Sequence, residues 1–316
     1  MKASILIPAF NAERTLRDTL ESCVLQGESA VEEIIVVDDH SKDETSSVFH
    51  NVSKQNPEFT WVWSQNPKKG ACSARNHAFQ LSKGHFIQWL DADDILGKNK
   101  IETQIKILEN SPNSIAACPF QPFQGSPTTK ISHSKKIWDI PPSSSKEDWL
   151  AADTMIGTHG WLAPRSITKA SGLWDESLLI NQDGEFFCRV AAMAQTIFFD
   201  DSVEVYYRKE GGGVSKFSAA KADSLFRSIQ LMQKTALAIE DSARMRRMIS
   251  NRFQSFIWTA YPHAKQLRKQ ARRHLQHLPK PNIANPIAIS PLSKTICQTL
   301  GWKTLTQLRL LRNRIL

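Results

Sequence analysis

Cysteine is scarce in this chain of 316 residues, and its placement argues against a disulfide or zinc framework. No two cysteines form a Cys-x-x-Cys pair, and their number is odd. The five stand at positions 23, 72, 118, 188 and 297. Small secreted domains and zinc modules instead carry paired cysteines at short spacings. We therefore expect a reducing compartment, and hence a cytoplasmic protein in which cysteine serves as a small apolar residue.

Long apolar runs are also missing. No stretch approaches the ~20 apolar residues that a membrane-spanning helix needs. The apolar stretch near the N-terminus is short and contains Pro8 and Asn11, so we expect no signal peptide. Hydrophobic residues make up 41% and charged residues 22% of the chain, which is close to globular averages and excludes a disordered or collagen-like protein.

Acidic residues are absent from the last quarter of the chain. Residues 242–316 hold 15 Lys and Arg but no Asp or Glu, whereas residues 1–241 hold 25 basic and 31 acidic side chains. Leucines recur at three- or four-residue spacing in 302–316, with arginines between them. A basic amphipathic tail of this kind suits the anionic headgroups of a membrane surface. It is also consistent with a solvated helix packed on the acidic body. A nucleic acid is not expected, because no DNA- or RNA-binding module is recognisable.

Strand and helix signals alternate along the first 120 residues. Short β-branched runs alternate with segments whose apolar residues recur at helical spacing. The runs lie at 4–7, 33–37, 59–63, 85–90 and 115–118, and the helical segments at 12–26, 71–83 and 98–109. Buried strands that alternate with helices predict an α/β fold, with a Rossmann-like, mostly parallel sheet flanked by helices. Ligands of such sheets bind beyond the carboxyl ends of the strands.

The remainder of the chain is less regular. Residues 121–147 are rich in Pro, Ser, Thr and Lys, and we expect them to form a long loop. Order returns with a helix near 184–193 and a strand near 203–207. Helical patterns follow at 218–240, 243–258 and 302–316.

Asp91 and Asp93 stand one residue apart, directly after a predicted buried strand. Both carboxylates can face one divalent cation there. Oxygen ligands suit Mn²⁺ or Mg²⁺, which in turn can hold a diphosphate. The other interpretation is an acidic loop that caps the next helix.

A second acidic pair, Asp38 and Asp39, ends another predicted strand. These carboxylates can accept hydrogen bonds from a nucleotide base or ribose, or they can cap the following helix. The sequence from Ser41 to Glu44 has the form of a capping box, in which the two side chains bond backbone N–H groups at the start of a helix. Because Ser41 would then fill the capping role, we expect the aspartates to be available for a ligand.

Residues 70–76, Gly-Ala-Cys-Ser-Ala-Arg-Asn, open a predicted helix. Lys68, Lys69 and the N-terminus of this helix supply positive potential for a phosphate. The segment is neither a Walker loop nor a dinucleotide fingerprint, since Gly-Lys-Ser/Thr and Gly-x-Gly-x-x-Gly are both missing.

These segments occur in an order and at a spacing that together resemble the family 2 glycosyltransferases of the GT-A fold. They are Ile-Pro-Ala-Phe-Asn at 7–11, Val-Val-Asp-Asp-His-Ser at 36–41, the segment at 70–76 and Leu-Asp-Ala-Asp-Asp at 90–94. The resemblance continues through Gly-Leu-Trp-Asp-Glu at 172–176, Asn-Gln-Asp-Gly-Glu-Phe-Phe at 181–187 and Tyr-Tyr-Arg at 206–208. The ordered set is far more specific than any of its members.

The resemblance implies a role for each matching residue. Asp183 would be the general base that takes the proton of an acceptor hydroxyl. Asp93 would bind the metal together with Asp91, and the metal would neutralise the departing diphosphate. The residues that would border the nucleotide-sugar are Pro8, Ala9, Phe10, Asn11, Asp38, Asp39, Gly70, Arg75, Asp91 and Ala92. A single displacement would invert the anomeric configuration.

Two departures from the family pattern bear on this site. Many members have Glu where Gln182 precedes the base here, so the surroundings of Asp183 differ. Many also have a His shortly after the Tyr-Arg pair, whereas residues 209–213 read Lys-Glu-Gly-Gly-Gly. Glu210 or a water molecule would then replace the His as a metal ligand. The Gly run fits either a mobile lid or a surface turn.

Three other residues near the expected base remain ambiguous. Trp161 and Trp174 fit either stacking against an acceptor sugar or the hydrophobic core. His159 is open to the same two interpretations.

We therefore expect a GT-A catalytic domain over 1–215, with a nucleotide-binding half (1–120) and an acceptor half (121–215), and a helical basic region over 216–316. The expected function is inverting, metal-dependent transfer of a hexosyl-type sugar from a nucleotide-sugar, a UDP-sugar, to a glycan or lipid-linked acceptor in polysaccharide or glycolipid synthesis. The alternative is a non-catalytic nucleotide or sugar binder of the same fold. A phosphatase of the haloacid dehalogenase type is disfavoured, because Ile95 stands where its motif usually has Thr or Val. We expect a cytoplasmic location, with peripheral contact to the inner membrane surface through the basic tail.

Overall fold

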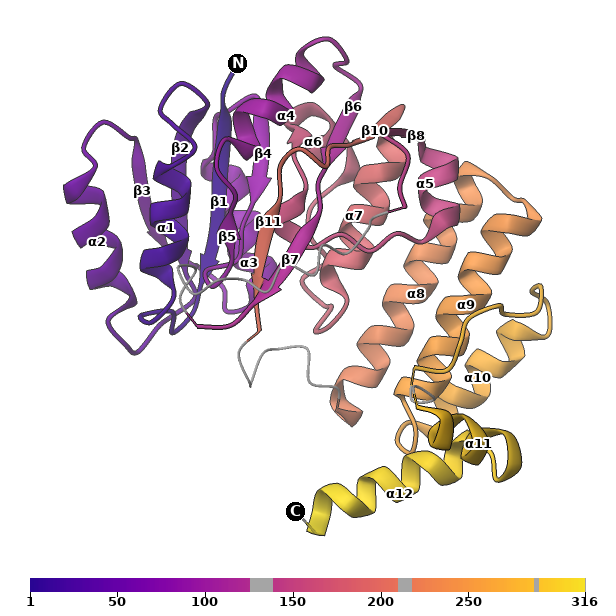
Figure 1. Ribbon diagram of the computed structural model, residues 1–316. Coiled ribbons are helices and arrows are strands. Elements are labelled where there is room, and N and C mark those ends of the chain that lie inside the picture. Colours follow the sequence, from indigo (N-terminus) through magenta and orange to yellow (C-terminus); the bar gives the residue numbers. More distant parts are fainter. Residues whose placement is uncertain (126–138, 210–217, 287–289, 316) are drawn as a thin grey trace. The chain divides into compact units, whose positions relative to one another are not determined.

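The computed structural model describes residues 1–125, 139–209, 218–286 and 290–315 (Figure 1). The chain divides into two compact units, Met1–Val214 and Ser215–Leu316. Within the described residues, every helix is too short or too polar to cross a membrane.

A five-stranded sheet forms the centre of the first unit. Its strands run in the order β3 (Trp61–Gln65), β2 (Val31–Asp38), β1 (Ala3–Ala9), β4 (Phe86–Trp89) and β9 (Ala163–Pro164). The first four strands are parallel, and β9 is antiparallel to β4. The central strands β1 and β2 are apolar on both faces, and Ile5, Ile34 and Val36 are completely buried. Such strands require helices on both sides of the sheet.

Three helices connect the parallel strands: α1 (Leu16–Val24), α2 (Thr45–Gln55) and α3 (Ala71–Leu81). α1 and α2 pack together, and α3 packs across β1 and β2. Crossovers between parallel strands are right-handed. Because the chain moves outward from β1 to β3 and then returns to β4, α3 covers the face opposite to α1 and α2.

This return of the chain creates a switch point between β1 and β4. The carboxyl ends of the two strands are tied together by a hydrogen bond from the Leu90 N–H to the Leu6 carbonyl (3.0 Å). The Thr15 hydroxyl, just before α1, donates to the Ala92 carbonyl (2.9 Å). Open α/β sheets bind their ligands in the crevice at such a switch point. The fold therefore places the candidate site at the ends of these two strands.

Two small sheets complete the first unit. One has the order β6 (Ser114–Ala117), β10 (Thr196–Phe199), β8 (Ser143–Ser145), and the other has the order β5 (Ile95–Leu96), β11 (Val205–Arg208), β7 (Phe120–Phe123). The strand predicted at 115–118 thus belongs to a small sheet, and an isolated bridge joins its Ala116 to Leu162, the residue before β9. The prediction of one long loop over 121–147 is also wrong in part, because β7 overlaps the start of this segment and β8 lies within it. Residues 126–138 of that segment lie outside the described part of the chain.

Four further helices belong to the first unit: α4 (Lys100–Glu109), α5 (Lys146–Ala152), α6 (Arg165–Ser171) and α7 (Gln182–Met193). α7 is held by an aromatic cluster. Phe186 stacks on Trp174 with ring centroids 4.0 Å apart, and Phe187 stacks on Trp161 at 5.1 Å. The buried aromatic face of α7 fixes the direction of its N-terminus, where Asp183 lies.

The second unit is entirely helical in its described residues. It contains α8 (Ala219–Ile239), α9 (Ala243–Thr259), α10 (Lys265–Leu275), α11 (Pro291–Thr299) and α12 (Trp302–Ile315). Phe226 of α8 contacts Phe253 and Phe256 of α9, with centroid distances of 5.8 and 5.2 Å. His274 of α10 stacks on Phe253 at 4.5 Å. Burial of these rings ties the three helices together.

The predicted fold class is confirmed: a mostly parallel sheet is flanked by helices. The runs predicted at 4–7, 33–37, 59–63 and 85–90 correspond to β1, β2, β3 and β4. Continuous apolar runs and period-3.6 patterns were sufficient here, because the central strands are buried on both faces and each helix buries one.

The predicted capping box is wrong. α2 begins at Thr45, and Ser41 lies outside the helix. The Ser41 hydroxyl instead accepts the Asn11 N–H (2.9 Å) from the loop after β1. The Glu44 carboxylate accepts a hydrogen bond from the Ser47 hydroxyl (2.6 Å). The Ser41 hydroxyl thus bonds a backbone group 30 positions away in the sequence and does not cap α2.

Candidate active site

The loop after β4 holds three aspartates with different surroundings. Asp94 is buried, and its carboxylate accepts the Arg208 N–H (2.9 Å) and lies 3.0 Å from the His159 ring. Asp91 is partly exposed, and Asp93 is exposed. Asp94 therefore anchors the loop from inside the protein, while Asp91 and Asp93 reach the surface. His159, which is 1% exposed, serves the core.

Asp93 is only weakly compensated, because the charge of Arg208 lowers the pKa of its carboxyl less than the surroundings raise it. Its carboxylate accepts no hydrogen bond from any other described residue, although it reaches the surface. The loss of hydration around it and the negative charges of Asp94 and Asp91 raise the pKa of the Asp93 carboxyl to about 7. A carboxylate surrounded by like charges is the environment that a cation relieves.

Arg75 connects the loop after β4 to the start of α7. One Nη donates to the Asp91 carboxylate (2.7 Å), and the other donates to the Gln182 side-chain carbonyl (3.3 Å). The guanidinium lies over the Trp174 ring, 4.5 Å from its centroid. Burial is the largest influence and would lower the pKa of Arg75, but the charge of Asp91, the hydrogen bond to Asp91 and other nearby charges together outweigh it, and the pKa is raised. The charge of Asp183 acts in the same direction.

Asp183 is the second residue of α7 and is half-buried. No described residue donates a hydrogen bond to its carboxylate. Its neighbour Gln182 is fixed by two contacts, because its amide group donates to the Leu178 carbonyl (2.6 Å) and accepts from Arg75. The backbone at Asp183 is thus anchored, while its carboxylate oxygens have no donor in the described part of the chain.

Tyr207 of β11 faces the same group of charges. Burial and then the charges of Asp94, Asp93, Asp91 and Asp183 raise the pKa of its hydroxyl. The ring remains 38% exposed. All four carboxylates therefore act on one solvent-accessible phenol, which brings the ends of β4, β11 and the start of α7 into one site.

Arg208, at the end of β11, is a buried brace for this site. Its guanidinium donates to the Asp93 backbone carbonyl (2.8 Å), to the Asp18 carboxylate of α1 (2.9 Å) and to the Gly125 carbonyl. Five donors in one planar group allow these simultaneous contacts. Arg208 therefore holds the backbone of the loop after β4 and leaves the Asp93 side chain free.

The end of β1 forms the neighbouring wall. Pro8 is half-buried and Ala9 is buried, whereas the Phe10 side chain is 51% exposed and has the Lys69 ammonium 5.6 Å from its ring centroid. Asn11 has a left-handed backbone (φ 48°), and its side-chain carbonyl accepts the Lys42 N–H (2.8 Å). Phe10 thus presents an open aromatic face, while Asn11 shapes the loop.

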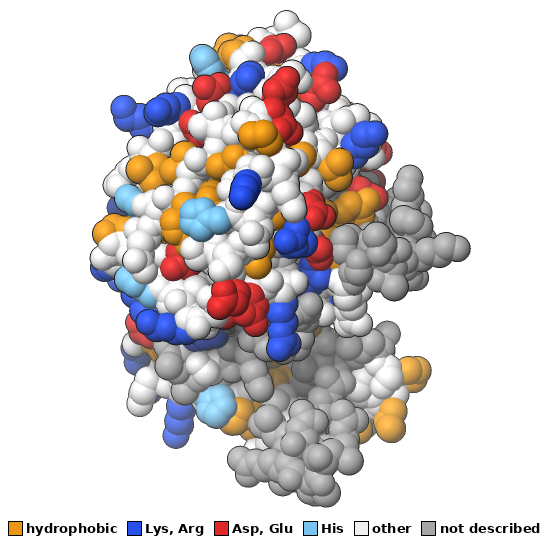
Figure 2. Space-filling model, turned by 90° about the vertical axis from the view of Figure 1, so that its left-hand side faces the viewer, with side chains coloured by type: hydrophobic (Ala, Val, Ile, Leu, Met, Phe, Trp, Pro, Cys, Tyr) orange, Lys and Arg blue, Asp and Glu red, His pale blue; other side chains and the backbone are white. Residues whose placement is uncertain are grey.

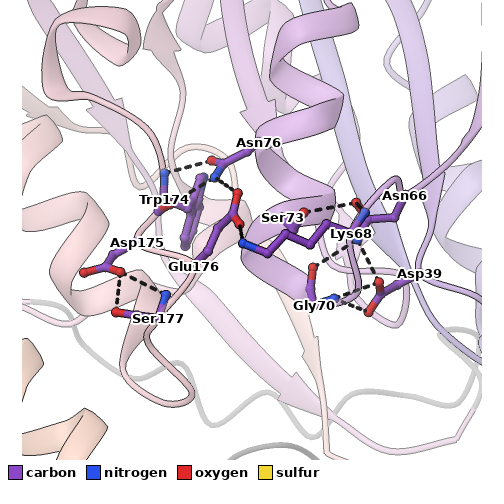
Figure 3. A network of polar contacts seen from close by, with 10 residues as sticks. All are labelled: Asp39, Asn66, Lys68, Gly70, Ser73, Asn76, Trp174, Asp175, Glu176 and Ser177. Carbon is purple, nitrogen blue, oxygen red and sulfur yellow. Dashed lines mark hydrogen bonds and ion pairs between the residues drawn. The ribbon is translucent and has the colours of Figure 1, made fainter.

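The end of β2 is used differently from what the sequence predicts. Asp39 is 8% exposed, and its carboxylate accepts the Gly70 N–H (2.8 and 3.0 Å) and the Asn66 side-chain amide (2.7 Å), as Figure 3 shows. Asp38 is also buried and accepts the Ser41 N–H (3.2 Å). Both carboxylates thus have protein partners, contrary to the expectation that they are unengaged, and their contact with a nucleotide stays a prediction.

Gly70 has a φ of 131°, a conformation that L side chains rarely adopt. This conformation turns its N–H toward Asp39 just before α3 begins.

A polar network joins the start of α3 to the segment before α7 (Figure 3). The Asn76 side chain accepts the Trp174 N–H (2.9 Å) and donates to the Trp174 carbonyl (3.0 Å) and to Glu176 (3.1 Å). The Lys68 ammonium lies 2.5 Å from the Glu176 carboxylate. The hydrogen bonds from Lys68 and Asn76 lower the pKa of Glu176. Lys68 is therefore paired within the protein and not left for a phosphate alone.

Trp161 and Trp174 belong to the core. They are 3% and 2% exposed, and each stacks on a phenylalanine of α7. Neither ring is open to a sugar. Among the two interpretations of these residues, burial favours packing.

Asp93 and Asp91 are the residues that fit a metal ion. The carboxylate of Asp93 is exposed and that of Asp91 is partly exposed, so both offer hard oxygen ligands, and Mg²⁺ is usually held by one or two carboxylates together with substrate phosphates. Within the described residues, no three His, Cys, Asp or Glu side chains form a metal cage. The donors therefore suit a cation shared with a diphosphate. Glu210 and the glycines at 211–213 lie outside the described residues.

Asn66, which is 1% exposed, supports this site although it belongs to none of the sequence motifs. It bonds Asp39, and its side-chain carbonyl accepts the Ser73 hydroxyl (3.2 Å). Its only sequence signal is its place directly after β3, at the same end of the sheet as the other polar residues. Arg208 belongs to the Tyr-Tyr-Arg segment at 206–208, but the family resemblance implies no role for it.

Comparisons with known proteins agree with this architecture. The sequence profile of Glycosyl transferase family 2 matches residues 4–170, more than half of the chain. A protein of Rickettsia typhi named as an uncharacterized glycosyltransferase is 29% identical over 215 residues, which cover 65% of this chain and 63% of that protein. The UDP-Glc:alpha-D-GlcNAc-diphosphoundecaprenol beta-1,3-glucosyltransferase WfaP of Escherichia coli is 36% identical over 106 residues, covering 34% of this chain and 41% of that protein. The chain thus spans less than two thirds of the length of these relatives.

Solved structures share the fold at low sequence identity. S. aureus TarS 1–349 in complex with UDP-GlcNAc has a TM-score of 0.68 and 18% identity, over 88% of this chain and 82% of that one. The mannosyltransferase PcManGT of Pyrobaculum calidifontis, in complex with GDP-Man and Mn²⁺, has a TM-score of 0.57 and 14% identity, over 96% and 83%.

Proposed function

Because the chain belongs to glycosyl transferase family 2, we propose that it transfers a sugar from a UDP-sugar to an acceptor hydroxyl, with inversion at the anomeric carbon. The observation that carries the proposal is the grip of Arg75 on both Asp91 and Gln182. This grip brings the loop after β4 and the N-terminus of α7 to one site, with Asp183 beside it. UDP as the nucleotide is supported by the name of the E. coli relative and by the UDP-GlcNAc in the TarS structure.

In this proposal Asp183 is the general base. An acceptor hydroxyl is a weak nucleophile, and a carboxylate within hydrogen-bond reach takes its proton as the oxygen attacks the anomeric carbon. The Asp183 oxygens have no described protein donor, so they can accept the hydroxyl. Attack from the side opposite the leaving diphosphate inverts the configuration in one displacement.

The donor occupies the switch point between β1 and β4. Phe10 offers its exposed face to the base, and the loop from Asn66 to Gly70, held by Asp39, forms the wall beside it. Asp93, with Asp91, would hold Mn²⁺ or Mg²⁺, which when bound neutralises charge on the diphosphate. The Mn²⁺ in the PcManGT structure supports this assignment.

The proposed acceptor is a glycan or lipid-linked hydroxyl in polysaccharide or glycolipid synthesis. The E. coli relative is named for a diphosphoundecaprenol acceptor, which resides at a membrane. We accordingly place the protein at the cytoplasmic face of a membrane.

The first test is a thermal-shift screen of UDP, GDP and their sugars with Mn²⁺, since a ligand that binds only the folded state raises the melting temperature. We expect UDP and UDP-sugars to stabilise the protein more than GDP, and more with Mn²⁺ than with a chelator. Stabilisation by GDP alone would contradict the choice of nucleotide.

The second test distinguishes an enzyme from a non-catalytic binder of the same fold. Asp183→Asn should keep the UDP-dependent thermal shift and lose turnover by on the order of 10³-fold, because only proton removal is affected. NMR of the product made by the wild-type protein should show the inverted anomer. If the wild-type protein binds the donor but no hydroxyl acceptor supports turnover, the non-catalytic alternative holds.

A further inference from the structure

The two units of the chain differ sharply in charge. Residues 1–214 hold 21 Lys and Arg and 28 Asp and Glu, and both signs are interspersed on the face shown in Figure 2. Residues 215–316 hold 19 Lys and Arg but only 3 Asp and Glu. Two of these three acids are paired, because Glu240 binds Arg244 and Asp241 binds Arg246. The positive charge of the second unit is therefore almost uncompensated from within.

α10 gathers this charge on one side. Four exposed cations lie at i, i+4, i+7 and i+8, which is one face of a helix. They are Lys265, Lys269, Arg272 and Arg273. The other side of the helix is inside the unit: Ala271 is completely buried, and Arg268 is 7% exposed with its guanidinium bonded to the His263 carbonyl (2.9 Å). None of the four exposed cations has an ion-pair partner among the described residues. The positive charge also acts on the buried side of α10. Burial and then the charge of Arg272 lower the pKa of Arg268.

The same unit exposes aliphatic side chains. Leu292 is 72% exposed, Leu300 is 64% exposed and Leu308 is 48% exposed, on or next to α11 and α12. No acidic residue lies between them, and Lys303 is exposed in the same stretch. Exposed leucines set among cations are characteristic of segments that lie in the interface of a bilayer, with the apolar groups inserted and the cations at the headgroups.

We propose that the four cations of α10 and Leu292, Leu300 and Leu308 form one surface that binds bilayers containing anionic phospholipid. Charge complementarity supplies the attraction, since each Lys or Arg near an anionic leaflet adds to the binding energy. A nucleic acid would satisfy the cations but would leave the leucines exposed, so the combination favours lipid. The proposal deepens the proposed function, because it would hold a transferase at the surface where a lipid-linked acceptor resides, but the binding itself does not depend on turnover.

The experiment is vesicle flotation of the full chain at about 0.1 M salt, where charges interact over ~10 Å. One set of vesicles is pure phosphatidylcholine, and the other is an equimolar mixture of phosphatidylcholine and phosphatidylglycerol. We expect binding to the mixed vesicles only, and a strong loss of binding at about 1 M salt. Equal binding to both vesicles, or to neither, would overturn the proposal.

The decisive variant replaces the four cations of α10 by Gln, which keeps helix propensity. We expect its partition onto mixed vesicles to fall on the order of 1000-fold, because each cation near the surface contributes about 1 kcal/mol. The matched control replaces four exposed lysines of the first unit, Lys2, Lys54, Lys98 and Lys169, by Gln, which removes the same net charge. It should float nearly as the wild type does. If the control loses as much binding as the α10 variant, net charge and not this surface is responsible, and the proposal fails.

Three further measurements separate the alternatives. Leu292→Gln with Leu300→Gln and Leu308→Gln should weaken flotation while leaving retention on heparin unchanged, because heparin engages only the cations. An unchanged flotation of this triple variant would refute the role of the leucines. Tight binding of duplex DNA at salt concentrations that abolish flotation would assign the surface to nucleic acid. Asp183→Asn should float as the wild type does even if it is inactive, so failure of the proposed chemistry and failure of this surface are distinguishable.

Discussion

β2 and β4 flank β1, and each ends in a pair of aspartates: Asp38 and Asp39 after β2, Asp91 and Asp93 after β4. The first pair is buried and accepts hydrogen bonds from backbone and side-chain groups of neighbouring loops. The second pair reaches the surface, and Arg75 is its one described ion-pair partner, through Asp91.

The contrast separates two uses of the same residue at the same place in a sheet. A buried carboxylate is tolerated when donors surround it, and it then rigidifies the loops that supply the donors. An exposed carboxylate among like charges adds nothing to stability and is available for a cation or a substrate. Position at a strand end therefore indicates where a site lies, and the local donors decide which carboxylates face the ligand.

The largest expected effect is on turnover, and it comes from the exposed Asp93 of the second pair. Asp93→Asn removes the proposed metal ligand, and turnover should fall by on the order of 10³-fold, because a metal contributes several kcal/mol of charge stabilisation. The free energy of unfolding should not decrease, since no described residue loses a hydrogen bond and repulsion by Asp94 and Asp91 is relieved. Initial rates with Mn²⁺ and urea unfolding of the metal-free protein measure the two quantities. A loss of stability with unchanged rates would reverse the assignment.

A substitution in the buried pair, Asp38 and Asp39, should instead lower the free energy of unfolding. Asp39→Asn deprives the Gly70 N–H and the Asn66 amide of a charged acceptor, and the free energy of unfolding should fall by about 1.5–3 kcal/mol. Asp201→Asn is the control, because Asp201 is exposed and should change stability by less than about 0.5 kcal/mol. Urea titration of the three proteins tests this. Unchanged stability of Asp39→Asn, combined with loss of UDP binding, would show that Asp39 serves the ligand and not the loop.

The comparison also explains how far sequence reasoning can reach. The strands and the edge of the sheet that carries the site follow from periodicity and from the ends of apolar runs, and the fold class is confirmed. Which hydrogen-bond donors surround each carboxylate does not follow from the sequence patterns, because the donors come from distant parts of the chain. Asp39 meets Gly70, 31 positions away, and Arg75 meets Gln182, 107 positions away. The prediction of a capping box is wrong for the same reason, since the Ser41 hydroxyl accepts a hydrogen bond from the loop after β1.

Arg75 tests whether the open carboxylates depend on one buried brace. Arg75→Lys keeps the charge but cannot bond Asp91 and Gln182 together, because an ammonium lacks the planar fork. We expect kcat to fall about 10- to 100-fold, since small displacements of reacting groups have effects of this size. Arg165→Lys is the matched control, because Arg165 bridges the Gly84 carbonyl and the Ser82 hydroxyl at the other end of the sheet. It should leave kcat unchanged, and an equal loss in both variants would point to general loosening.

Lys100 extends the comparison to a buried cation. It is completely buried, and its ammonium donates to the Gln88 side chain and to the Trp161 carbonyl (3.0 Å). Burial lowers its pKa to about 8. The unfolded chain, with an ordinary pKa near ~10.4, binds more protons above pH ~8, so the free energy of unfolding contributed by Lys100 rises with pH in that interval. Between about pH 7.5 and 9.5 the wild type should gain roughly 1–2 kcal/mol relative to Lys100→Met. Urea unfolding curves of both proteins at both pH values measure this difference. A constant difference would mean that the pKa of Lys100 is not lowered and that its ammonium stays charged in the folded protein.

The smallest expected effect concerns the ion pair between Lys68 and Glu176, which spans the start of α3 and the segment before α7. Its 2.5 Å separation suggests a strong contact, but the Lys68 side chain is 72% exposed, and exposed pairs are screened by water and salt. A double-mutant cycle of Lys68→Gln and Glu176→Gln should therefore give a coupling energy below about 1 kcal/mol, decreasing further at high salt. The same cycle read out by UDP affinity sharpens the comparison of the two acidic pairs. If Glu176→Gln tightens UDP binding while Lys68→Gln weakens it, Lys68 exchanges a protein carboxylate for a phosphate on binding. If neither substitution changes the affinity, the pair does not contact UDP, and like Asp39 it only stabilises the loops.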